Sequence, residues 1–145
     1  MSSPRIDPGE LKRLTEIVVT LLNNRDFEFE TSNGKELLRH LDSDFEGRFD
    51  TLPHTINFDQ QLEIWKQNAK DHPTLQFSTL QVTTRLQRRS NTASVYLMLG
   101  ITGMGTVRYQ GSCELRWRYH NDRWLLCSHI TMRGPLFDSL LLEDL

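Results

Sequence analysis

A carboxylate and an imidazole on two neighbouring strands are the strongest indication of chemistry in the sequence. Residues 111–134 contain two long alternating runs around the polar turn HNDR, which predicts an antiparallel hairpin with Asn121-Asp122 as its two-residue loop. In that register Glu114 lies directly opposite His129, with Cβ atoms about 5 Å apart. A carboxylate that orients an imidazole can produce a general base near neutral pH. The alternative is a structural cross-strand ion pair, which contributes about 0.2–1 kcal/mol.

Three other polar side chains are candidates for a site. Asp50 and His54 lie four residues apart in RFDTLPH, where Asp50 is either a solvated loop carboxylate or a base, and His54 is either a turn residue or its neighbour in the site. Tyr96 occurs in the mostly apolar run TASVYLMLGIT and needs a hydrogen-bond partner if it is buried. It is therefore a candidate donor in a pocket.

Helices dominate the first half of the chain. Asp7 as N-cap with Pro8 predicts a helix that ends at Asn23-Asn24, and a second, short helix is expected from near Asn33 through KELLRHL. The run DSDFEGRFDTLPHT then reads as a short strand kinked at a glycine and ended by a proline. Asn57 is expected to cap a third helix over 58–72.

Strands dominate the second half. In TLQFSTLQVTTRLQRR the apolar positions change phase, which predicts a β-bulge near Ser78-Thr79. The run 92–102 is apolar on both faces, which predicts a strand buried on both sides. The strands of the hairpin follow, and the tail beyond Pro135 is amphipathic enough for a last short helix. Helices separated from antiparallel strands indicate the α+β class.

Composition excludes several classes of protein. The 145 residues predict a single domain over 1–145, with a core at about 8–134 and a tail at 135–145. A net charge of −2 argues against nucleic acid as a partner, and no apolar run is long enough to span a membrane. The N-terminus lacks the pattern of a secretory signal, and the two cysteines are expected to point to opposite faces and stay reduced, which fits a cytoplasmic protein. The sequence has no metal-ligand, phosphate-loop or GxSxG motif, so we expect no metal and no cofactor.

The order of elements, together with a closing polar turn followed by Arg-Trp-Leu, resembles the NTF2-like superfamily, also called SnoaL-like or ketosteroid-isomerase-like. The resemblance covers about residues 8–134. It implies a bent antiparallel sheet wrapped around three N-terminal helices as a cone, with a pocket at the open end and a homodimer formed through the sheet. Members include isomerases, cyclases and dehydratases as well as binding modules without chemistry, so the fold does not decide the activity.

The resemblance also assigns positions. The general base of the ketosteroid isomerases falls near Asp50, close to His54, and their protonated acid on the penultimate strand falls on Glu114. Their phenolic donor falls near Val18, a departure that argues against steroid isomerase chemistry itself. The last strand is implied to turn Cys127 and His129 towards the pocket.

Two arguments conflict on which face of the sheet lines that pocket. Apolar periodicity favours as the buried row Cys113, Leu115, Trp117, Leu126 and Ile130. Because the outer face in this superfamily often packs against a second subunit, both faces can be partly apolar. We therefore expect Glu114 and His129 to face the pocket.

The leading hypothesis is a cofactor-independent isomerase, cyclase or dehydratase that acts by proton transfer on a hydrophobic polyketide- or terpenoid-like substrate. Its catalytic candidates are Asp50, His54, Glu114 and His129, and its substrate-binding candidates are Trp65, Tyr96, Val18, Cys127 and Phe137, the last from a tail expected to close over the mouth. The alternative is a non-catalytic ligand-binding or dimeric protein-interaction module.

Overall fold

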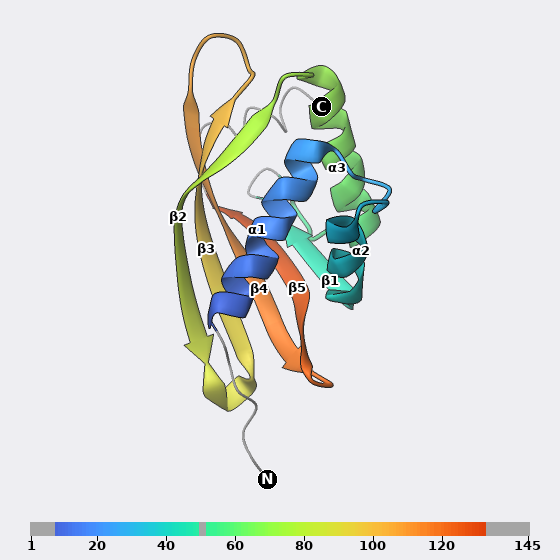
Figure 1. Ribbon diagram of the computed structural model, residues 1–145, viewed down its shortest axis with the longest axis vertical. Coiled ribbons are helices and arrows are strands. Elements are labelled where there is room, and N and C mark those ends of the chain that lie inside the picture. Colours follow the sequence, from blue (N-terminus) through green and yellow to red (C-terminus); the bar gives the residue numbers. More distant parts are fainter. Residues whose placement is uncertain (1–7, 50–51, 133–145) are drawn as a thin grey trace.

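The computed structural model describes residues 8–49 and 52–132, which form one layer of helices on the inner face of one bent sheet (Figure 1). The helices are α1 (Pro8–Asn24), α2 (Ser32–Arg39) and α3 (Phe58–Asp71). The strands are β1 (Leu41–Arg48), β2 (Gln76–Gln87), β3 (Thr92–Thr102), β4 (Tyr109–His120) and β5 (Arg123–Met132), with a 3-10 turn η1 (Arg88–Ser90) between β2 and β3. The α+β class is as expected, and no described helix is long and apolar enough to cross a membrane.

The helix starts follow from side-chain capping. Asn57 and Gln60 form the expected reciprocal capping box at α3, in which each side chain accepts a hydrogen bond from the other residue's backbone N–H. α2 begins at Ser32, near the expected Asn33, and the Thr31 side chain caps it by accepting a hydrogen bond from the backbone N–H of Gly34. Leu41, expected in this helix, begins β1 instead.

The sheet has the strand order β1-β5-β4-β3-β2. Neighbouring strands are antiparallel except β1, which lies parallel to β5, so the sheet is mixed rather than wholly antiparallel. The bulge expected in β2 is confirmed, since the pairing with β3 shifts between Thr79 and Gln81. Such bulges bend a strand, and this one curves the sheet towards the helices.

The core lies between the helices and the concave face of this sheet. Trp117 and Leu115 on β4 are 0% and 2% exposed, and α1 buries Leu11 and Leu14 against them and their neighbours. The outer face of β3 is less covered than the sequence indicated, because Met98 is 40% exposed. The prediction of a strand buried on both sides is therefore wrong for this chain alone, since helices cover only one face.

Candidate functional site

A one-residue bulge in β5 separates the two residues that the sequence placed opposite each other. The hairpin has the expected loop, and Trp117 pairs with Leu126 as predicted. The register then shifts, so that Arg116 pairs with Ser128 and His129 lies opposite Leu115. The expected Glu114–His129 pair is wrong, because the extra residue turns His129 to the face opposite that of Glu114.

Glu114 lies on the outer face of the sheet, contrary to the expectation that it faces the pocket. Its carboxylate accepts hydrogen bonds from the Ser94 hydroxyl at 2.7 Å and the Arg116 Nε at 2.8 Å. Arg118 on the same face binds Asp42 of β1. These polar groups therefore have hydrogen-bond partners on the outer face. Glu114 forms a structural ion pair, as the alternative interpretation held, but with Arg116 instead of His129.

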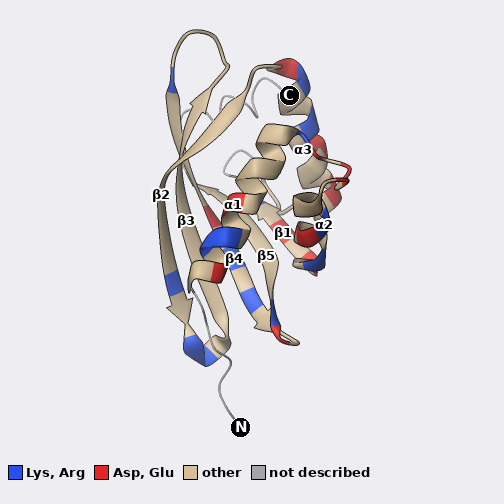
Figure 2. Ribbon diagram, in the orientation of Figure 1, with Lys and Arg blue, Asp and Glu red and all other residues tan. Residues whose placement is uncertain are grey.

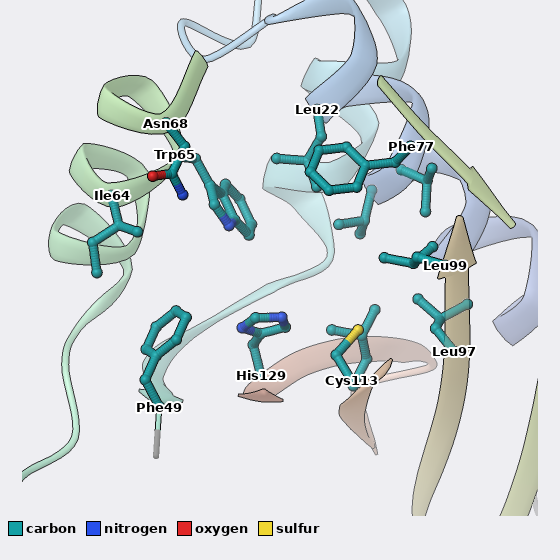
Figure 3. A pocket seen from close by; sticks show the side chains of 13 residues that line it. Leu22, Phe49, Ile64, Trp65, Asn68, Phe77, Leu97, Leu99, Cys113 and His129 are labelled. Atoms are coloured by element: carbon teal, nitrogen blue, oxygen red, sulfur yellow. The ribbon is translucent and has the colours of Figure 1, made fainter. Parts of the chain in front are cut away.

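His129 lies at the base of an apolar cavity of about 50 Å³ between the helices and the concave face of the sheet (Figure 3). This volume accommodates a few water molecules or a small organic group. The other lining side chains are almost all hydrocarbon, aromatic or thiol: Val18, Val19, Leu22, Phe49, Ile64, Trp65, Phe77, Leu97, Leu99, Cys113 and Leu115, with Asn68 as the exception. A buried imidazole in such a cavity is the feature that distinguishes it from an ordinary core.

Two aromatic rings fix the imidazole of His129. The Phe49 ring stands edge-on to it at 5.7 Å between centroids, and the Trp65 indole does so at 6.1 Å. The side-chain Nδ1 has no hydrogen-bond partner among the described residues. Burial lowers the pKa of His129 from 6.5 to about 4, so the ring is neutral at pH 7. A neutral imidazole offers one N–H donor and one nitrogen acceptor to whatever enters the cavity.

The polar side chains of α3 are functional candidates that the sequence analysis missed. Asn68 lines the cavity and its Oδ1 lacks a partner within the described chain, as do both side-chain polar atoms of Gln61. Gln61 packs closely on Gly47: a Cβ added at Gly47 would come within 2.5 Å of the Gln61 Oε1. Gly47 in turn pairs with His129 across β1 and β5, so Gln61 lies close to the backbone at His129. The signal was present in the spacing of Gln61, Trp65 and Asn68, but the apolar residues of α3 suggested a neighbouring face.

The remaining sequence candidates divide between several places. Val18 and Trp65 line the cavity as expected. Tyr96 and Cys127 instead line an outer groove of about 400 Å³ beside Glu114, so their expected place in the pocket is wrong. For Tyr96 the cause is its pairing with Glu114, which shares its face. Cys127 follows Leu126, whose partner Trp117 is on the concave face, so the alternation of the strand turns Cys127 outward.

Three candidates lie away from the cavity or beyond what the structure describes. His54 is exposed in the loop before α3. Asp50 and Phe137 lie outside the described residues, so their roles stay predictions.

Charge is absent from much of the cavity wall. β3 carries no charged residue, whereas the helices, β1 and β4 each carry several (Figure 2). Burial raises the pKa of the Cys113 thiol to about 12, so it stays protonated. Within residues 8–49 and 52–132, no three His, Cys, Asp or Glu side chains gather as metal ligands would. His129 and Asn68 are therefore the polar groups that the described cavity offers to a ligand.

Comparison with known proteins supports the fold and leaves the activity open. No protein-family model and no curated protein matches the sequence. Among solved structures, an NTF2-like protein from Cytophaga hutchinsonii has a TM-score of 0.61 at 11% identity, covering 88% of this chain and 98% of its own. An NTF2-like protein of unknown function from Pseudomonas putida KT2440 has a TM-score of 0.67 at 11% identity, covering 85% and 83%. A third neighbour, AclR, described as a putative hydroxylase from Streptomyces galilaeus, has a TM-score of 0.60 at 14% identity, covering 96% and 95%.

These likenesses show that the chain has the NTF2-like fold, as its order of elements predicted. At such identities a shared fold carries no shared chemistry. What this chain does has to be argued from its own cavity.

Proposed function

We propose that the cone binds a small, mainly hydrophobic molecule and that His129 takes part in moving a proton on it. The observation that carries the proposal is a buried imidazole, with its Nδ1 unpartnered by any described residue, at the base of an apolar cavity. A buried polar atom without a partner costs about 1–3 kcal/mol, and a ligand that bonds to it recovers this cost. Hydrophobic walls bind the body of the ligand, while one polar contact fixes its orientation.

The low pKa determines the role that suits His129. With a pKa of about 4 the ring is a weak base but a neutral hydrogen-bond donor at pH 7. A neutral imidazole N–H can stabilise negative charge that develops on a carbonyl oxygen when a proton leaves the neighbouring carbon. The matching base is Asp50 if the prediction from the resemblance holds. The reaction class is cofactor-independent isomerisation, cyclisation or dehydration of a polyketide- or terpenoid-like compound.

Deuterium exchange at the α-carbon of 2-indanone, followed by NMR in D₂O, tests this proposal. The compound is apolar and carries one carbonyl, so its chemistry matches the apolar lining and the single imidazole of the cavity. We expect the protein to accelerate exchange over buffer, and we expect His129→Leu and Asp50→Asn each to reduce the acceleration at least about tenfold, the usual size of one catalytic contact. His120→Leu, at an exposed hairpin position, is the matched control and leaves the rate unchanged.

A non-catalytic binding module is the second candidate, and one observation favours it. In the described cavity wall the titratable side chains are His129 and Cys113, and the thiol stays protonated. Binding of 2-indanone without accelerated exchange, in the wild type and in both variants, would establish this second function. Failure to bind small apolar ketones would contradict both.

The outer face supports a homodimer as a further part of the proposal. Two apolar residues are exposed there: Leu80 is 51% exposed and Met98 is 40% exposed. A dimer through this face would cover them. Analytical ultracentrifugation of wild type and Met98→Glu tests it, since a charge at the contact would favour the monomer.

A further inference from the structure

A second, smaller cavity adjoins the first and ends at a positively charged side chain. Its volume is about 20 Å³, and it shares Leu22, Trp65, Asn68 and Phe77 with the larger cavity. Figure 3 shows these four side chains facing each other across the space above the His129 ring. Beyond them lies Arg25, the one charged residue that lines the smaller cavity in the described chain.

The charge of Arg25 is not neutralised by the described residues. Its Nη2 donates to the backbone carbonyl oxygens of His72 at 3.4 Å and Leu75 at 3.5 Å, both at the long limit of a hydrogen bond. The ion pairs found in residues 8–49 and 52–132 use Arg13, Lys66, Arg116 and Arg118 instead. Arg25 is a half-buried residue, and its guanidinium has five N–H donors but contacts two neutral acceptors at long distance.

The backbone at Arg25 is in a conformation that usually belongs to glycine. The N–H of Arg25 donates to the Leu22 carbonyl and that of Asp26 to the Leu21 carbonyl, which is the Schellman arrangement at the end of α1. Arg25 takes the left-handed position of this motif with φ +56°. A non-glycine residue there costs about 1 kcal/mol. This turn ends α1 and brings Arg25 to the wall of the smaller cavity.

We propose that Arg25 binds the carboxylate of an elongated hydrophobic acid whose apolar part passes between Trp65 and Phe77 towards His129. This proposal deepens the proposed function and rests on it. A guanidinium holds a carboxylate through two parallel N–H···O bonds. The rest of the cavity lining is almost all apolar, which suits the hydrocarbon part of such an acid. Arg25 then selects the acid, while His129 contacts the far end of the same molecule.

Calorimetric titration with 3-phenylpropanoate and with its neutral counterpart 3-phenylpropanamide tests the proposal. We expect the wild type to prefer the acid by at least about tenfold, as a charge-assisted bidentate contact would produce. Arg25→Asn removes the guanidinium and keeps a residue that tolerates the left-handed backbone, so it should bind both compounds within about twofold. Arg89→Asn, which removes the same charge from the exposed turn η1, should keep the preference.

The possible results separate the two proposals. Equal affinity of wild type for acid and amide, or a preference that survives in Arg25→Asn, would overturn the role of Arg25 and leave ligand binding in the cone intact. Failure of both compounds to bind would overturn both. Arg25→Gly provides a second variant, because glycine is the residue that this backbone position favours, and its loss of preference cannot be attributed to unfolding.

Discussion

The two faces of the sheet differ in whether they hold buried polar groups without a hydrogen-bond partner. On the outer face, Glu114, Ser94 and Arg116 bind one another, and Asp42 binds Arg118. On the concave face and the helices that cover it lie all the buried side-chain polar atoms that lack a partner in the described chain: those of Thr15, Gln61, Asn68, Trp117 and His129. Satisfied groups stabilise a structure, whereas unsatisfied groups beside a cavity are available to a ligand. The lack of a hydrogen-bond partner therefore locates the candidate site better than the presence of an acidic or basic side chain does.

The largest expected effect is on the free energy of unfolding, which should depend on which face of the sheet loses a leucine side chain. Leu115→Ala on the concave face, at a side chain 2% exposed, should lower the free energy of unfolding by about 2–5 kcal/mol, because it removes buried apolar contacts and enlarges the cavity that this side chain lines. Leu80→Ala makes the same change on the outer face, where the residue is 51% exposed in the single chain, and should cost less than about 0.5 kcal/mol at protein concentrations low enough to keep the chain monomeric. Urea unfolding measures both. Similar losses would mean that the outer face is covered in solution.

The next effect is a pH dependence of the free energy of unfolding, which arises from His129 on the concave face. Below pH 6.5 the unfolded chain protonates His129, whereas the folded chain does so only near its native pKa of about 4. The native state therefore loses up to about 3 kcal/mol as the pH falls from 7 to 4.

His129→Leu should remove this part of the slope, because leucine does not titrate. Unfolding free energies at pH 4.5 and 7 measure it in wild type, His129→Leu and the exposed control His120→Leu. An unchanged slope in His129→Leu would show that His129 is accessible to water in solution.

The two cysteines provide a third comparison, one on each side of the sheet. Both are free thiols, as the sequence predicted, with Cys113 buried and Cys127 half-buried at the bulge. Burial raises the pKa of both thiols, that of Cys113 to about 12. We expect iodoacetamide at pH 8 to modify Cys127 at least about tenfold faster in the native protein, as mass spectrometry can measure. Rapid labelling of native Cys127→Ser would show that the cavity opens readily.

The smallest effect is expected at Glu114. Glu114→Gln keeps an acceptor for the Ser94 hydroxyl and loses the charge that faces the 54% exposed Arg116 side chain, so the cost should be about 1 kcal/mol or less. Binding of 2-indanone should not change, because the side chain lies on the other face. A loss of binding in this variant would restore Glu114 to the site.

The sequence predicted most of the fold because local signals determined it. The capping box at Asn57, the loop at Asn121-Asp122 and the bulge in β2 all leave marks in the types and spacing of residues. The bulge in β5 leaves no such mark, since Leu125 and Ile130 make the outer face of that strand partly apolar as well. The candidate site depended on this one residue of register, so the sequence identified His129 but paired it with the wrong residue.

Arg25 could not have been predicted from the sequence for a different reason. Arginine just after a helix is an ordinary favourable charge at the carboxyl end of the helix dipole. Its cavity depends on Phe77 and Leu75, which are about fifty residues away in the chain. Such a site arises from tertiary contacts alone.

The parallel pairing of β1 with β5 has a consequence for the order of folding. Arg48 pairs with Ile130, so the edge that leads into Phe49 closes only after more than half of the chain has been made. Contacts so distant in sequence close a long loop, which makes them slow to form and places them late in folding. We expect the antiparallel sheet of β2 to β5 to assemble with α1 first, and the cavity to become a closed space in the final step. Amide hydrogen exchange would then be faster in β1 than in β4, so that the binding site would be the last part of the molecule to form and the first to open.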